Sequence, residues 1–177
     1  MQRLLGLIRS EFKYKKIDFE NDKWHRNLPN TSGWYLLSTN TPFEVFTSLP
    51  APPSMYKNKD GETKKCRNDN IKSRAQTFSK SAECYMPRIN EQSMQVVYSG
   101  KAKNILDRAK DHTFGHPGTA ALAISKYTEL VKYRWEFHYM EYNLKYQSPS
   151  DERDIIALKL GEEIWRANNG WPLLCVD

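Results

Sequence analysis

Residues 94–112 read MQVVYSGKAKNILDRAKDH, and this stretch decides the fold. Its first part, residues 94–99, is short, apolar and rich in β-branched and aromatic side chains, which predicts a strand that ends at Gly100. Its second part, residues 101–112, carries apolar residues at helical spacing, which predicts a helix directly after the strand. A strand that passes straight into a helix indicates a sheet with helices packed against it.

Further elements are expected on either side of this stretch. The aromatic run 33–38 follows a turn-forming cluster and predicts an earlier strand, and alternating aromatic residues over 133–142 predict a third strand. Helical spacing of apolar residues predicts helices over 2–14 and 119–131. A last helix is expected to begin at Ser148 or Ser150 and to end at Asn168-Asn169-Gly170. We therefore expect an α+β (mixed α/β) fold, with a small central three-stranded sheet flanked by helices.

A long insertion separates the first two expected core strands. Residues 41–93 contain several prolines and then a lysine-rich stretch, residues 57–65. A loop of this length is either a solvated surface segment or a basic arm that embraces a ligand. The chain has 177 residues, which is the length of one domain. We expect a single domain over residues 1–177, with residues 1–32 as an N-terminal extension.

Charge and cysteine content narrow the classes of function. Lysine and arginine total 27 against 21 acidic residues, and aromatic residues make up 12%, so a polyanion such as nucleic acid is a suitable partner. The three cysteines have no paired spacing, which argues against a disulfide framework or a zinc site. The first apolar run is too short for a signal peptide or a membrane span. We expect a cytoplasmic protein, and no P-loop, Rossmann glycine pattern or nucleophile-elbow serine is present.

The order of several residues resembles the GIY-YIG nucleases. Gly-Trp-Tyr at 33–35 resembles the first element of that family, and Tyr-Ser-Gly at 98–100 resembles the second. Arg108 and His112 follow on the expected helix, where the family carries an arginine and, in many members, a histidine or tyrosine. The family has isoleucine where this chain has tryptophan and serine, its compact members have a shorter insertion, and its closing asparagine has no counterpart after Pro172.

The resemblance implies the catalytic residues Tyr35, Tyr98, Arg108, His112 and Glu162. Lys101 is added to this set because its positive charge could help a tyrosine to lose its proton. The resemblance also implies that Glu162, with Glu163 as the alternative, holds a divalent ion, Mg²⁺ with Mn²⁺ as a substitute. One protein carboxylate is enough when water and substrate complete the shell of such an ion.

Elementary chemistry of phosphodiester cleavage agrees with these residue types. The transition state gathers negative charge, which the planar guanidinium of Arg108 can meet. A tyrosine has an ordinary pKa near ~10, so it needs positive charge nearby to act as a base. The general base is left open among Tyr35, Tyr98 and His112.

The expected function is therefore a divalent-metal-dependent endonuclease that acts on double-stranded DNA. A stand-alone chain of this size is most similar to the type II restriction endonucleases of the family, which implies sequence-specific cutting by a homodimer or higher oligomer. Contacts to DNA are expected from the lysines of the insertion and of the helix start: Lys57, Lys59, Lys64, Lys65 and Lys103. Two alternatives stay open, a non-catalytic nucleic-acid-binding module and a non-specific, toxin-like nuclease.

Overall fold

A five-stranded antiparallel sheet forms the centre of the computed structural model, which describes residues 12–78, 87–89, 94–142 and 152–175. The three strands expected from the sequence lie together in its middle, and two short strands extend it at the edges. The α+β class is confirmed, and the sheet is wider than the three expected strands. The spatial order is β1 (Lys13–Lys16), β7 (Trp135–Glu141), β2 (Gly33–Thr39), β6 (Met94–Ala102) and β5 (Arg88–Ile89).

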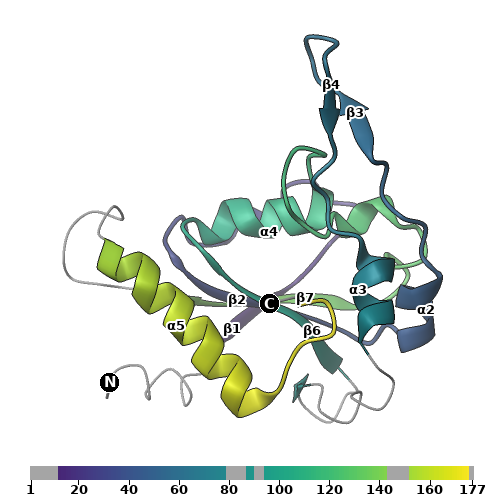
Figure 1. Ribbon diagram of the computed structural model, residues 1–177. Helices are drawn as coiled ribbons and strands as arrows, with labels where there is room; N and C mark the ends of the chain where they lie inside the picture. The colour runs from purple at the N-terminus through teal and green to yellow at the C-terminus, as the bar shows by residue number, and fades with distance from the viewer. Residues whose placement is uncertain (1–11, 79–86, 90–93, 143–151, 176–177) are drawn as a thin grey trace.

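Helices cover both faces of this sheet (Figure 1). Successive residues of a strand point to opposite faces, so neighbours on β2 contact different helices. Trp34 donates its indole N–H to the carbonyl of Leu158 in α5 (Glu152–Asn169) at 2.8 Å. Tyr35, the next residue, places its hydroxyl against α4 (Ile105–Phe114). Every residue of β2 is buried, because this strand lies between the two helical layers.

The helix α4 begins later than its sequence pattern indicates. Asn104 caps it, since its side-chain oxygen accepts a hydrogen bond from the amide of Asp107 at 3.1 Å. Lys101 and Ala102 still belong to β6. Ile105 on the first turn is fully buried and anchors α4 on the hydrophobic core of the sheet.

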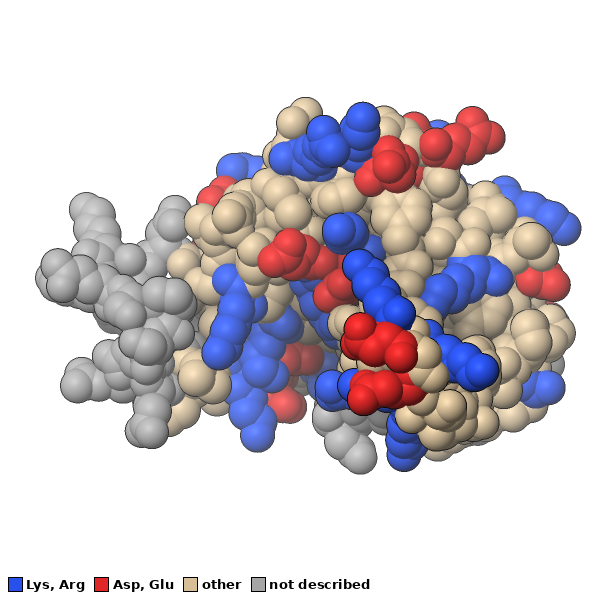
Figure 2. All heavy atoms as spheres, turned by 90° about the horizontal axis from the view of Figure 1, so that it is seen from above, with Lys and Arg blue, Asp and Glu red and all other residues tan. Residues whose placement is uncertain are grey.

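The insertion is folded and has its own secondary structure. Two short helices, α2 (Phe43–Ser48) and α3 (Ile71–Thr77), pack against each other beside the sheet. Between them, β3 (Met55–Lys57) and β4 (Thr63–Lys65) form a separate two-stranded sheet that projects from the body (Figure 1). We refer to residues 55–65 as the ribbon. Figure 2 looks onto the ribbon from above and shows lysine and arginine side chains across this side of the molecule, with acidic side chains among them.

The helix expected over residues 119–131 is wrong. This segment contains turns and one short 3-10 helix, η3 (Ile124–Lys126), which follows Ala123 at a left-handed φ of 52°. Tertiary hydrogen bonds use its backbone: the carbonyl of Ala121 accepts from an amide of the insertion, and the amide of Leu122 donates to a histidine ring of α4. These backbone groups are therefore bonded to other parts of the fold, where a continuous helix would bond them to each other.

The helix expected over residues 2–14 is wrong where the structure describes it. Residues 1–11 lie outside the described residues, but residues 13–16 form β1, which pairs with β7. A short 3-10 helix, η1 (Trp24–Asn27), leads from β1 toward β2. The caps expected near residue 150 for the last helix also lie outside the described residues.

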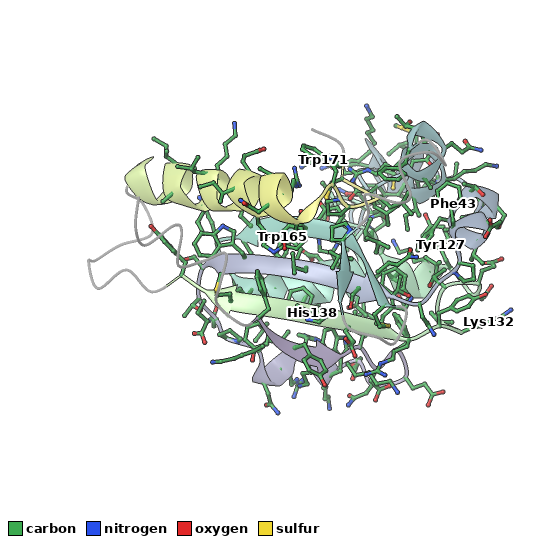
Figure 3. All side chains as sticks on the ribbon, turned by 90° about the horizontal axis from the view of Figure 1, so that it is seen from below. Phe43, Tyr127, Lys132, His138, Trp165 and Trp171 are labelled. Carbon is green, nitrogen blue, oxygen red and sulfur yellow. The ribbon has the colours of Figure 1, made fainter. Side chains whose placement is uncertain are left out.

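The helix α5 packs closely on the sheet because Gly161 has no side chain. A Cβ at this position would lie 2.6 Å from ring atoms of Trp34. Figure 3 shows α5 above the sheet with Trp165 turned toward the strands. The helix ends at Asn169, as expected, and Gly170 follows with a φ of 106°, which glycine adopts without strain. Within the described residues, no helix has the length and apolar character needed to cross a membrane.

The close packing of α5 at Gly161 can be tested by whether an alanine there raises or lowers the stability of the protein. In the interior of an exposed helix, replacing glycine by alanine stabilises by about 1 kcal/mol. At Gly161 the new methyl group overlaps Trp34, so we expect Gly161→Ala to lower the free energy of unfolding by about 1–3 kcal/mol. Urea unfolding measures this. Lys159→Ala, at an exposed position of the same helix, is the control and is expected to change stability by less than about 0.5 kcal/mol. A stabilised Gly161→Ala protein would contradict the close packing of Gly161 against Trp34.

Candidate active site

The hydroxyl of Tyr35 is the centre of a polar cluster under β6. Arg108 donates from Nε to this oxygen at 2.9 Å, and His112 Nε2 lies 2.9 Å from it. Both partners come from α4, one helical turn apart. The hydroxyl lies against Gly100, where a Cβ would overlap it, so the glycine is required for this arrangement. The sheet therefore brings Tyr35 and α4 together at the one position of β6 that has no side chain.

The tautomer of His112 follows from its two hydrogen bonds. The amide of Leu122 can only donate, and it lies 3.3 Å from His112 Nδ1, so Nδ1 is an acceptor without a proton. The proton of the neutral ring is then on Nε2, which donates to Tyr35. Burial lowers the pKa of His112 well below its ordinary value, and the positive charges of Arg108 and Arg74 lower it further. His112 is a neutral donor at pH 7.

Tyr35 accepts two hydrogen bonds, from Arg108 and from His112, and is itself 1% exposed. Burial raises its pKa well above the ordinary value, Tyr98 adds to this, and the positive charge of Arg108 opposes it. The two lone pairs of the phenol oxygen are both occupied. Tyr35 is thus a buried anchor that fixes the direction of the Arg108 side chain.

Tyr98 and Arg108 carry the polar groups of this cluster that can still form hydrogen bonds with a ligand. The Tyr98 ring stacks on Tyr35 with centroids 6.1 Å apart and packs on His112 at 4.7 Å, and no described residue forms a hydrogen bond with its hydroxyl. Arg108 donates from Nη1 to the carbonyl of Ala120 at 2.6 Å, and its Nη2 has no partner among the described residues. Burial raises the pKa of Tyr98, and Arg108 is the largest opposing cause. The partly exposed phenol of Tyr98 and the fixed guanidinium of Arg108 therefore both pack on Tyr35, and Arg108 is near enough to act on the pKa of Tyr98.

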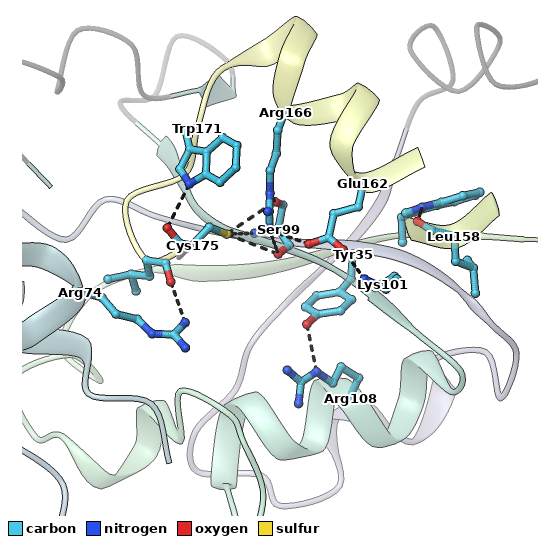
Figure 4. Close-up of polar contacts among 12 residues, drawn as sticks. Tyr35, Arg74, Ser99, Lys101, Arg108, Leu158, Glu162, Arg166, Trp171 and Cys175 are labelled. Atoms are coloured by element: carbon cyan, nitrogen blue, oxygen red, sulfur yellow. Dashed lines mark hydrogen bonds and ion pairs between the residues drawn. The ribbon is translucent and has the colours of Figure 1, made fainter. Parts of the chain in front are cut away.

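A second polar cluster lies on the opposite face of the sheet, under α5. Glu162 accepts from Lys101 Nζ at Oε2, 3.0 Å away, and from Arg166 Nη2 at Oε1, 2.5 Å away. Arg166 also donates from Nε to Ser99 Oγ at 2.9 Å. Figure 4 shows Glu162 and Arg166 on one side of β6 and Tyr35 with Arg108 on the other.

The two clusters approach each other at the outer edge of β6. In the described part of the chain, β5 pairs only with Met94 and Gln95, and the C-terminal segment bonds β6 at Val97 and Ser99. Beyond Ser99 no described strand covers this edge. Glu162 is near enough to contribute to the raised pKa of Tyr35. A ligand that lies along the edge at Gly100 can contact groups from both faces.

The structure thus brings together four of the predicted site residues and places two others across the sheet. Tyr35, Tyr98, Arg108 and His112 form one cluster, and Lys101 with Glu162 forms the other. Glu163, the alternative to Glu162, is exposed on α5. The predicted DNA-contacting lysines are all exposed, four on the ribbon and Lys103 before α4: Lys57, Lys59, Lys64, Lys65 and Lys103.

Sequence reasoning missed two arginines of the site. Arg166 is buried beside Glu162, and the spacing of four residues on one helix was the available signal. Arg74, on α3 of the insertion, forms a 2.7 Å ion pair with the buried Asp69 and adds positive charge near His112 and Tyr98. Nothing in the local sequence places Arg74 there, because the contact depends on how the insertion folds back.

The resemblance implies a divalent ion at Glu162, and the donor set fits one arrangement. The described residues contain no group of three or more histidine, cysteine, aspartate and glutamate side chains that could hold a metal. Mg²⁺ keeps much of its water and is often bound by one or two carboxylates. Oε1 of Glu162 faces the buried Arg166, but Oε2 faces Lys101, whose side chain is 37% exposed. Glu162 fits a largely hydrated ion at Oε2, provided that Lys101 moves away.

Comparisons of the chain with protein-family models, with curated proteins and with solved structures find no match.

The buried, neutral His112 makes stability depend on acid pH. Its folded-state pKa lies below the ordinary value of 6.5, so below that pH the unfolded chain takes up a proton that the folded chain does not. Stability is therefore lost as the pH falls from 7 toward 5. His112→Asn removes this proton uptake, so its free energy of unfolding will be lower at pH 7 but will fall less steeply with acid. Urea unfolding at several pH values measures both slopes.

The matched control is His116→Asn, because His116 is an exposed histidine just beyond the same helix. We expect this variant to keep the pH slope of the unchanged protein. An unchanged slope in His112→Asn would show that His112 is not the buried neutral group described above.

Proposed function

We propose that the protein is a divalent-metal-dependent endonuclease that hydrolyses DNA phosphodiester bonds at the outer edge of β6. The observation that carries the proposal is the guanidinium of Arg108, which Tyr35 and the carbonyl of Ala120 hold in one direction. The ring of Tyr98 stacks on the same Tyr35, and its hydroxyl has no hydrogen-bond partner among the described residues. A rigid cation with free donors next to a weak acid is what charge stabilisation and proton transfer at a phosphate require.

Each residue of the cluster has a role that follows from its contacts. Arg108 offers Nη2 to the non-bridging oxygens of the phosphate, where negative charge grows in the transition state. Tyr35 and His112 are positioning residues, because both are buried and hold Arg108 in its direction. Lys101, which reaches solvent at the same edge, adds a second positive charge for the DNA backbone.

Tyr98 is the best of the three candidates for the general base. His112 is fully buried and donates its only proton to Tyr35, and the oxygen of Tyr35 already accepts two hydrogen bonds. Tyr98 has a hydroxyl without a described partner and is partly exposed. Burial raises the pKa of Tyr98 and the positive charge of Arg108 opposes this rise, so Tyr98 depends on Arg108 to form the phenolate that a base needs.

Glu162 is the residue that would hold the metal. A bound divalent ion polarises the phosphate and neutralises developing charge. Arg166 orients the carboxylate through Oε1 and is itself fixed by Ser99, so the second oxygen keeps one direction. Lys101 forms an ion pair with that oxygen. If a metal ion took its place, the Lys101 side chain would turn toward the DNA backbone.

One observation favours a second candidate, a nucleic-acid-binding module without catalysis. Both oxygens of Glu162 are in ion pairs with cations, as in a purely structural buried cluster. Salt-dependent DNA binding together with no cleavage in Mg²⁺ or Mn²⁺ would support this candidate.

Plasmid cleavage tests the nuclease proposal and its restriction-type form. Incubation of supercoiled plasmid with the protein and Mg²⁺ is expected to yield discrete linear fragments, and EDTA is expected to abolish them. A smear would favour a non-specific nuclease. Double-strand cutting with one site per chain requires two chains, so the active species is expected to elute as a homodimer or higher oligomer on DNA.

The roles of the two tyrosines separate in a pair of variants. Tyr98→Phe removes the proposed base and is expected to reduce the cleavage rate by about 100-fold or more, with DNA affinity nearly unchanged. Tyr35→Phe removes an acceptor that positions Arg108 and is expected to cost less, about tenfold. The measurement is the single-turnover rate of plasmid cleavage as a function of pH. In Tyr98→Phe, the part of this pH dependence that comes from deprotonation of the base is expected to disappear.

Tyr133→Phe is the matched control, because this tyrosine is partly buried elsewhere, just before β7, and should leave the rate unchanged. Equal activity of Tyr98→Phe and the unchanged protein would exclude Tyr98 as the base.

A further inference from the structure

The ribbon has two different faces, and only one of them contacts the body. Strand register pairs Met55 with Lys65 and Lys57 with Thr63, and these four side chains share one face. Tyr56 points to the other face and packs edge-on against the ring of His116, with centroids 5.4 Å apart. We refer to Met55, Lys57, Thr63 and Lys65 as the outer face. All four of its residues are exposed.

The turn of the ribbon is held in one shape by its own side chains. Asn58 accepts from the amides of Asp60 and Glu62 through Oδ1, at 3.1 and 2.8 Å, and donates from Nδ2 to the Glu62 carboxylate at 2.8 Å. Gly61 supplies the left-handed residue of the turn, with a φ of 80°. An ordered ribbon loses less conformational entropy on binding than a floppy loop.

The charges of the ribbon suit a polyanion. It contains four lysines and only two acidic residues. One of these acids, Glu62, forms an ion pair at 3.0 Å with Lys64, which does not belong to the outer face. In the described part of the chain, no ion pair involves Lys57 or Lys65. Lysines along the edges of a ribbon disfavour strand pairing with a second copy. The outer face thus presents two free cations, a hydroxyl and an exposed methionine, which suit phosphates, base edges and the thymine methyl group.

The base of the ribbon is bonded to the loop that also holds Arg108. The amide of Arg67 donates to the carbonyl of Pro117 at 2.6 Å, and Asn68 donates to the carbonyls of His116 and Thr119 at 3.0 and 3.1 Å. Residue 120, next along this loop, accepts from Arg108. DNA that contacts the ribbon is therefore held at a defined position relative to the guanidinium.

We propose that the outer face of the ribbon enters the major groove of double-stranded DNA and reads the site at which the chain cuts. A two-stranded ribbon fits this groove, and the major groove carries the unique pattern of base-edge groups. The proposal rests on the nuclease function above, because it names how the substrate of that same site is recognised.

Two adjacent lysines supply a matched pair of variants. Lys64 and Lys65 are neighbours on β4, both exposed, but Lys65 lies on the outer face and Lys64 on the opposite face. Lys65→Ala is expected to weaken binding to plasmid restriction fragments about tenfold and to reduce the salt slope of binding by about 1. Lys64→Ala removes the same charge and is expected to weaken binding by no more than about twofold. Fluorescence anisotropy in EDTA, at several salt concentrations, measures both.

Methylation of the bound DNA by dimethyl sulfate then shows which groove the protein occupies. Guanine N7 lies in the major groove and adenine N3 in the minor groove, so the unchanged protein and Lys64→Ala should protect guanines on the plasmid restriction fragment that the unchanged protein binds most tightly. Lys65→Ala should lose that protection. Protection of adenine N3 alone, or equal footprints for both variants, would overturn the ribbon proposal and leave the nuclease proposal intact. Normal binding and footprints without cleavage would instead overturn the nuclease proposal alone.

Discussion

The rest of the site depends on one contact, the packing of the Tyr35 hydroxyl against Gly100. Any larger residue at position 100 would take the space of that hydroxyl. Because the oxygen is there, Arg108 and His112 converge on it, and the ring of Tyr98 stacks beside it. A glycine in the middle of a strand weakens the sheet locally. Here it makes room for the Tyr35 hydroxyl, so the loss in the strand is offset by the hydrogen bonds that Tyr35 forms with Arg108 and His112.

Two polar clusters lie on opposite faces of β6 near this glycine. Glu162 and Lys101 lie on the α5 side, and the tyrosines lie on the α4 side. Clusters on opposite faces of a sheet are normally separate sites. In the described part of the chain, however, β5 pairs only with Met94 and Gln95, and no described strand covers the outer edge of β6 beyond the C-terminal segment. In the proposed nuclease, a phosphate at that edge would contact the guanidinium of Arg108 from one face and the carboxylate cluster of Glu162 from the other.

The sequence was sufficient for the parts that depend on local pattern. The three central strands, the helix of Arg108 and His112 and the end of the last helix follow from spacing and from glycine positions. The parts that failed depend on distant partners. Residues 119–131 have helical spacing but use their backbone on other elements, and residues 13–16 become a strand because β7 offers an open edge. Sequence order also suggested one convergent site, because order alone does not tell which face of the sheet a side chain takes.

The insertion changes how recognition and chemistry relate. As a solvated loop it would bind DNA independently of the site, and its lysines would add affinity only. The structure instead connects the ribbon and Arg108 to the same loop, residues 116–120. The base of the ribbon bonds one part of this loop, and Arg108 bonds another. A shift of that loop moves the ribbon and the guanidinium together. Arg74 of α3 strengthens the link, since it lies near Tyr98 and bonds the C-terminal segment that covers β6. In the proposed nuclease, recognition by the insertion and charge stabilisation at the phosphate would therefore depend on one connected unit.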